Sequence, residues 1–154
     1  MRASPWNPVP DVVGPCADIS FERLLTGELQ VTMHFSTVVG LPDKDLRLRF
    51  TNVLAVWWEV ECPGIEAVPA KLPKCAAPEW DKWTFPLLTV EGAEFLERLR
   101  PIYERAGVAA LGHFLLVSMN DLIQVVASSI VEATWVRGQA HNANPVESRQ
   151  ADIC

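Results

Sequence analysis

The stretch Glu28-Leu-Gln-Val-Thr-Met-His-Phe-Ser36 decides the fold, because apolar and polar residues alternate along it without interruption. A period of two places alternate side chains on opposite faces, which is typical of a β-strand with one buried face. The polar turn 41–45 follows, and the segment 46–51 then alternates in the same way. Together the two segments predict an antiparallel hairpin.

The apolar run that continues over 53–61 no longer keeps one parity. It predicts either a bulge near Thr51-Asn52 or a strand that is covered on both faces. Further along, the segments 113–118 and 122–127 flank a turn and predict a second hairpin. The alternation over 131–136 predicts one more strand.

One segment has the period of a helix. The apolar residues of 91–106 fall on one helical face, and they are Phe95, Leu96, Leu99, Ile102 and Tyr103. Pro101 should end or kink this helix close to Arg100, and Gly107 supplies a stop. We therefore expect an α+β fold, mainly an antiparallel β-sheet or sandwich with one packed helix over about 91–107.

The length of 154 residues fits one domain with a sizeable core. Residues 1–18 hold four prolines and predict an extended arm, 19–137 a single globular domain, and 138–154 a flexible tail. The segment 62–86 shows no helical or strand period and contains five prolines. Because ordered irregular segments of this length are usually functional, 62–86 is the most informative irregular part of the chain.

Composition and charge exclude several classes of protein. Hydrophobic residues make up 49% of the chain and charged residues 21%, a balance that excludes an intrinsically disordered chain. Uninterrupted apolar runs such as 53–58 are far shorter than the roughly 20 residues of a membrane helix. The net charge of −6 disfavours nucleic-acid binding. The first ten residues have no apolar leader segment, so we expect a cytoplasmic protein.

Local motifs give no support for catalysis, a cofactor or a metal. The sequence has no nucleophile elbow, phosphate-binding glycine loop or zinc-protease motif, and His34, His113 and His141 have no ligand-like spacing. We therefore expect a chain that is not an enzyme. The four cysteines are expected to be reduced, although a Cys62–Cys75 disulfide stays open for an oxidising compartment.

Tryptophan is the unusual feature, with six residues in the chain. Two of them flank an acid in the segment 62–86, where Glu79, Trp80, Asp81 and Trp83 bring acids and large aromatics together. Such a combination is typical of binding hot spots, so these four residues are the predicted partner-binding centre. The alternative is that the two tryptophans pin the segment onto the sheet.

Glu59 and Glu61 share one face of the strand predicted over 53–61, and they join the predicted partner-binding residues as an acidic patch. A merely solvated strand face is the alternative. Trp57 and Trp58 should point to opposite faces of the same strand. One of them would then be available to line a cavity.

Three segments resemble small, largely uncharacterised bacterial β-rich proteins, some of which are immunity proteins that neutralise a toxic effector. The first is the strand Leu-Arg-Leu-Arg-Phe-Thr-Asn-Val-Leu-Ala at 46–55. The second is Phe-Pro-Leu-Leu-Thr-Val at 85–90 with the Phe-Leu-Glu helix start that follows it at 95–97. The third is the hairpin at 113–127. The resemblance covers about residues 28–128 and implies a β-rich domain.

The first functional hypothesis is a non-catalytic cytoplasmic inhibitor of the immunity or antitoxin type that binds a basic effector or toxin. The second is a small-ligand-binding protein or enzyme whose cavity is lined by Trp57 or Trp58 and gated by 62–86. A structural subunit needs only an exposed sheet edge, and a homodimer stays open.

Overall fold

The computed structural model describes residues 1–60, 69–108 and 110–138, and the side chains of residues 59 and 60 lie outside this description. The described part forms strands, one α-helix and one short 3-10 helix. Their bounds are β1 Arg2–Pro5, β2 Asp18–Arg23, β3 Leu29–His34, β4 Lys44–Val60, η1 Pro78–Trp80, β5 Leu87–Glu91, α1 Glu94–Arg105, β6 Gly112–Val117 and β7 Asp121–Arg137.

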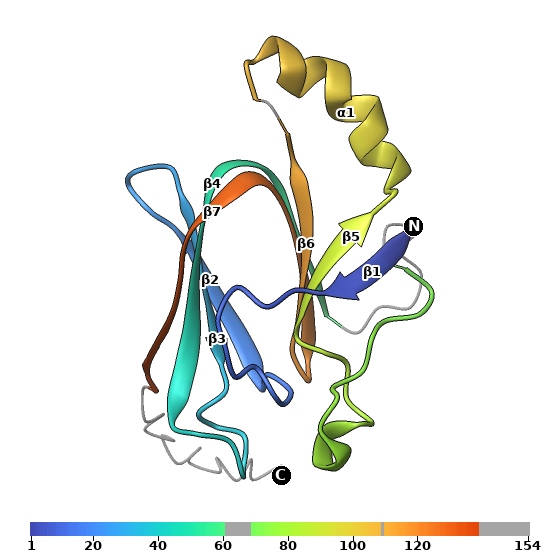
Figure 1. Cartoon of the computed structure of the whole chain (residues 1–154). Helices are drawn as coiled ribbons and strands as arrows, with labels where there is room; N and C mark the ends of the chain where they lie inside the picture. The colour runs from blue at the N-terminus through green and yellow to red at the C-terminus, as the bar shows by residue number, and fades with distance from the viewer. Residues whose placement is uncertain (61–68, 109, 139–154) are drawn as a thin grey trace, which may run out of the picture.

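The strands form one seven-stranded sheet in the order β1-β5-β6-β7-β4-β3-β2, with every neighbouring pair antiparallel. This confirms the predicted α+β class and both predicted hairpins, β3–β4 and β6–β7. β4 and β7 run side by side for 17 residues each and bend over, so that the two halves of the sheet face each other (Figure 1). The fold is therefore one curled sheet, with its core inside the curl.

The bend coincides with the bulge that the broken alternation predicted. The register between β4 and β7 shifts between Arg49 and Phe50 and again between Val53 and Ala55. Between these shifts Asn52 adopts a positive φ of 48°. A bulge adds a residue to one strand and increases its local twist, which bends the strand. The bulge residues thus account for the curl.

The core follows the alternation of β3 and β4. Val31 and Met33 of β3 are fully buried, as are Leu46, Leu48 and Phe50 of β4. Phe50 contacts Phe114 of β6 across the curl, with ring centroids 5.3 Å apart. The polar residues between them form the outer face of the same strands. In the half formed by β3 and β4, the sheet therefore has an apolar, buried inner face and a polar outer face.

Three strands differ from what the sequence predicted. The alternation at 131–136 does not form a separate strand but continues β7, because Ser129 pairs with Thr51 of β4 and the strand runs on unbroken. Residues 2–5 of the predicted arm pair with β5 at the sheet edge, where Pro5 ends the strand. β2, at the other edge, was not predicted, because only Ile19 of its six residues is buried.

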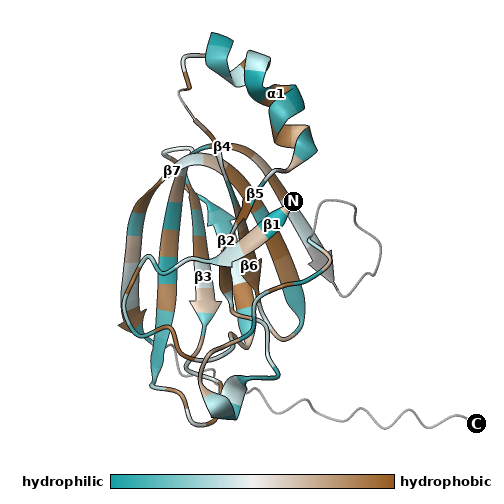
Figure 2. Ribbon diagram, turned by 45° about the vertical axis from the view of Figure 1, so that its right-hand side comes forward, coloured by the Kyte–Doolittle hydropathy of each residue, from teal (hydrophilic) through white to brown (hydrophobic). Residues whose placement is uncertain are grey.

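The helix α1 is shorter than predicted and meets the sheet mainly through its first turn. It continues through Pro101 to Arg105, and its end is closed by a 3.2 Å bond from the Ala106 N–H to the Ile102 carbonyl. Phe95 packs against the core, whereas Ile102 is 60% exposed. Figure 2 shows the largely hydrophilic helix projecting beyond the sheet. No helix among the described residues is both long and apolar enough to cross a membrane.

Candidate functional site

Residues 73–85 belong to the predicted irregular segment and are here called the tryptophan loop. Backbone hydrogen bonds within the loop fix its shape. The Cys75 N–H donates to the Trp83 carbonyl at 2.9 Å, and the Phe85 N–H donates to the Pro73 carbonyl at 2.9 Å. At the tip, the Trp80 N–H closes the 3-10 turn onto the Ala77 carbonyl. The loop is therefore ordered although it has no regular period.

Trp80 anchors this loop to the rest of the fold. Its ring is half-buried and packs against the core cluster. It lies so close to Gly14 that a Cβ atom added there would sit 3.1 Å from the indole Nε1. A Cβ atom added at Gly40 would lie 3.8 Å from the ring. Trp80 thus joins the loop to the N-terminal segment and to the turn before β4, which is the pinning arrangement that the sequence left open.

The other three predicted contact residues of the loop face solvent. Glu79 and Asp81 are exposed, and Trp83 keeps 40% of its surface accessible. Trp83 also borders a cavity of about 210 Å³ that Lys74 and Lys82 line. The surface formed by Glu79, Asp81 and Trp83, here called the loop surface, combines an exposed indole with two acids, and Lys74 and Lys82 border it.

We expect the two tryptophans of the loop to differ in their effect on stability. Trp80→Ala should lower the free energy of unfolding by about 2 kcal/mol, because it removes half-buried apolar surface and leaves a gap against Gly14. Trp83→Ala should lower it by less, about 1 kcal/mol, because 40% of the Trp83 surface is already accessible to solvent. Urea unfolding followed by circular dichroism measures both. Equal losses in the two variants would contradict the assignment of Trp80 as the anchor.

The acidic pair predicted on β4 is only partly described. The backbone of Glu59 pairs with Leu122 near the end of β4, and Glu61 lies outside the described residues. Trp57 and Trp58 precede them, are 41% and 58% exposed, and contact different rings. Trp57 contacts Phe95 of α1, and Trp58 contacts Phe21 of β2.

Trp57 lines an open cavity of about 540 Å³ together with Phe95, Arg98 and the N-terminal residue Met1. Beneath Phe95 lies His113, which is 2% exposed and shares a 2.9 Å hydrogen bond between its Nε2 and the Gln124 side chain. Burial lowers the pKa of His113 below the usual value. The cavity therefore has aromatic walls formed by Trp57 and Phe95, and the buried His113 contacts Phe95 from outside its lining.

The described cysteines are buried free thiols. Cys16 and Cys75 have no disulfide partner among the described residues, and Cys62, the predicted alternative partner of Cys75, lies outside them. Burial raises the pKa of both thiols, and for Cys75 the neighbouring Lys74 opposes the shift. Both are therefore protonated and poorly reactive at neutral pH.

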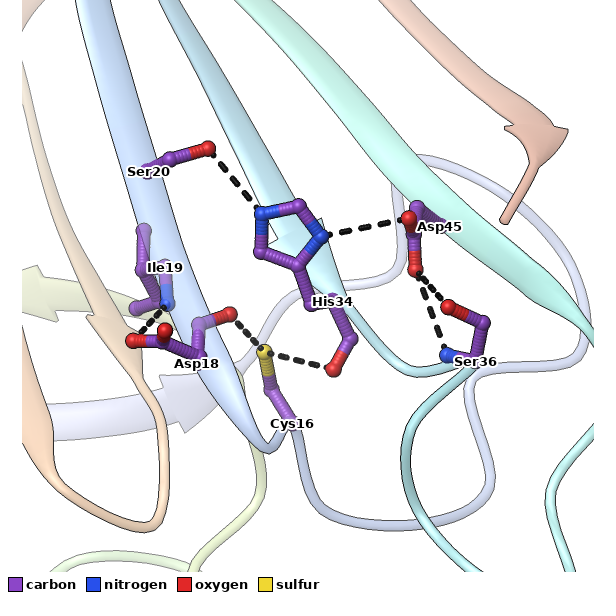
Figure 3. A network of polar contacts seen from close by, with 7 residues as sticks. All are labelled: Cys16, Asp18, Ile19, Ser20, His34, Ser36 and Asp45. Atoms are coloured by element: carbon purple, nitrogen blue, oxygen red, sulfur yellow. Dashed lines mark hydrogen bonds and ion pairs between the residues drawn. The ribbon is translucent and has the colours of Figure 1, made fainter. Parts of the chain in front are cut away.

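A polar network on the outer face joins β2, β3 and β4 (Figure 3). His34 lies at its centre, with Nδ1 3.2 Å from Asp45 Oδ2 and Nε2 3.0 Å from Ser20 Oγ. The other Asp45 oxygen accepts hydrogen bonds from the Ser36 N–H at 3.2 Å and the Ser36 hydroxyl at 2.8 Å. His34 is thus largely buried and is held from two sides.

Asp45 is the charged member of this network. It is 1% exposed, and although burial opposes its ionisation, the hydrogen bonds from Ser36 and His34 hold the pKa of Asp45 below its usual value. A carboxylate only accepts hydrogen bonds, so His34 donates from Nδ1 to Asp45, and in the neutral imidazole Nε2 is then the acceptor for the Ser20 hydroxyl. Cys16 closes the network from below, donating from Sγ to the Asp18 and His34 carbonyls.

No protein-family model, curated protein or solved structure matches this chain.

Proposed function

We propose that the chain is a binding protein of the immunity type, which neutralises a toxic effector by direct contact through the loop surface. One observation carries the proposal: Trp83 is exposed between charged residues on a loop whose backbone bonds and Trp80 anchor fix its shape. An indole on a rigid support buries a large area on binding and loses little conformational entropy.

The charge of the chain indicates the kind of partner. The chain carries 19 acidic and 13 basic residues, and Glu79 and Asp81 bring two of the acids next to Trp83. An acidic protein attracts a basic partner and accelerates its capture. Lys74 and Lys82 border the same surface, so the partner would also offer at least one acid there. We therefore propose a basic effector or toxin in the bacterial cytoplasm, where the two free thiols would stay reduced.

The experiment uses the tagged chain to capture its partner from the native host and compares two charge reversals. Asp81→Lys lies on the loop surface, and Glu104→Lys makes the same charge change on α1, at the opposite end of the molecule (Figure 1). We expect Asp81→Lys to weaken capture by about 30-fold, the loss typical of a hot spot. Glu104→Lys should bind as the wild type does.

If both charge reversals weaken capture equally, the effect comes from net charge and the loop surface is not the contact. If neither weakens it, the partner binds elsewhere. Circular dichroism of both variants checks that the fold is retained.

The cavity beside Trp57 favours a second candidate function, the binding of a small ligand. Its volume of about 540 Å³ and its aromatic walls suit a small apolar molecule, since the charged residues of its lining, Glu94 and Arg98, already pair with each other. Replacing Trp57 distinguishes the two functions, because Trp57→Ala would abolish ligand binding and leave capture of the protein partner unchanged.

A further inference from the structure

The network on the outer face links a hydroxyl, an imidazole and a carboxylate in the order in which they occur in acyl-transfer sites. Ser20, His34 and Asp45 come from three adjacent strands, and the hydrogen bonds run from Ser20 Oγ to His34 Nε2 and from His34 Nδ1 to Asp45 Oδ2. In such an arrangement the imidazole is the general base for the hydroxyl, and the carboxylate fixes its tautomer and stabilises the imidazolium. We propose that Ser20 is the nucleophile of an esterase site that acts on small anionic esters.

The surroundings of Ser20 give a substrate room and access. Ser20 is exposed on β2, the edge strand of the sheet, whereas Asp45 at the other end of the network is buried. A cavity of about 320 Å³ lies over the network, and Ser20, His34 and Asp45 all contribute to its wall. This volume fits a small molecule and is too small for a folded partner.

The cavity also contains the positive charge that the reaction needs. Arg47 and Arg137 line it beside the network. The Arg47 Nε is buried and has no hydrogen-bond partner among the described residues, so its N–H is an unsatisfied donor that a ligand oxygen could accept. A guanidinium group binds carboxylates and developing oxyanions well. Arg47 and Arg137 therefore favour a substrate that carries a negative charge, although Glu22 also lines the cavity.

The proposed reaction is hydrolysis in two steps. The Ser20 oxygen forms a bond to the ester carbonyl carbon, its proton passes to His34 Nε2, and this proton leaves with the departing alkoxide as an alcohol. Water then attacks the acyl-serine, gives its proton to His34, and releases the carboxylic acid. The bond between the Ser20 oxygen and the acyl group breaks, and His34 returns the proton to this oxygen, which restores the hydroxyl. Asp45 stays ionised throughout.

The test treats the purified full chain with a fluorophosphonate probe and maps the adduct by mass spectrometry. We expect one adduct per chain, on Ser20. Ser20→Ala should prevent labelling, whereas Ser129→Ala, at another exposed serine of the same sheet, should leave it unchanged. His34→Gln should slow labelling by about 100-fold, the usual contribution of a general base.

Ester hydrolysis provides the second readout, with the 4-nitrophenyl half-ester of succinic acid as the anionic probe and 4-nitrophenyl acetate as the neutral one. Arg47→Met should raise KM for the anionic ester by about 10-fold and leave KM for the neutral ester unchanged. The proposal is overturned if Ser20→Ala hydrolyses both esters at the wild-type rate, or if the probe labels another residue in a folded wild-type chain.

Discussion

Replacing Phe50 with alanine should lower the free energy of unfolding by about 4 kcal/mol, because a buried phenylalanine is lost from the centre of the core. Phe50 is fully buried on β4 next to the bulge, and its ring contacts Phe114 on the other half of the curled sheet. The cavity would thus open where the two halves meet. Urea unfolding followed by tryptophan fluorescence measures the loss.

Phe21→Ala is the matched control for this change. Phe21 lies on the edge strand β2, is 42% exposed, and contacts only the exposed ring of Trp58 among the aromatic residues of the described part. We expect a loss of about 1 kcal/mol, in proportion to the smaller buried area. Similar losses for Phe50→Ala and Phe21→Ala would mean that the core is not centred on the bend.

Asp45→Asn should lower the free energy of unfolding by about 3 kcal/mol at neutral pH. The buried carboxylate accepts bonds from His34 and from two groups of Ser36, and a neutral amide, which has a single acceptor oxygen, leaves at least one of these donors without an acceptor. Asp43→Asn, at an exposed acid of the same turn, is the control and should change stability little.

The effect of Asp45→Asn should also depend on pH. Because folding lowers the pKa of Asp45, its ionised form stabilises the fold fully above the ordinary value of 3.8, and this contribution is lost as the pH falls through the lowered pKa. The difference between wild type and Asp45→Asn should therefore be constant near neutrality and shrink in acid. A difference that stays the same down to the acid transition would show that the Asp45 charge is not the stabilising group.

Strands with one fully buried face were predictable from the sequence, and edge strands were not. β3 alternates strictly, and every inward residue from Leu29 to Met33 is buried. In contrast β1 has no fully buried residue, because an edge strand is held by backbone bonds more than by packing. The prolines near residue 5 indicated an irregular arm, although proline is tolerated at a sheet edge.

The candidate sites likewise separate into one that local sequence indicates and one that it does not. The tryptophan loop was predictable because its acids and aromatics are neighbours in sequence, but which indole anchors the loop depends on contacts with Gly14 and Gly40 that no local pattern contains. The Ser20–His34–Asp45 network was not predicted. Its members are 14 and 11 residues apart, and only the register of three strands brings them together.

The most direct test of the proposed binding function is the dissociation constant of the complex with the captured partner, measured by titration calorimetry for wild type and Trp83→Ala. We expect a rise of at least about 30-fold, equivalent to about 2 kcal/mol, in a variant that stays folded. A dissociation constant within about threefold of wild type, less than 1 kcal/mol, would contradict the account and exclude the loop surface as the centre of binding.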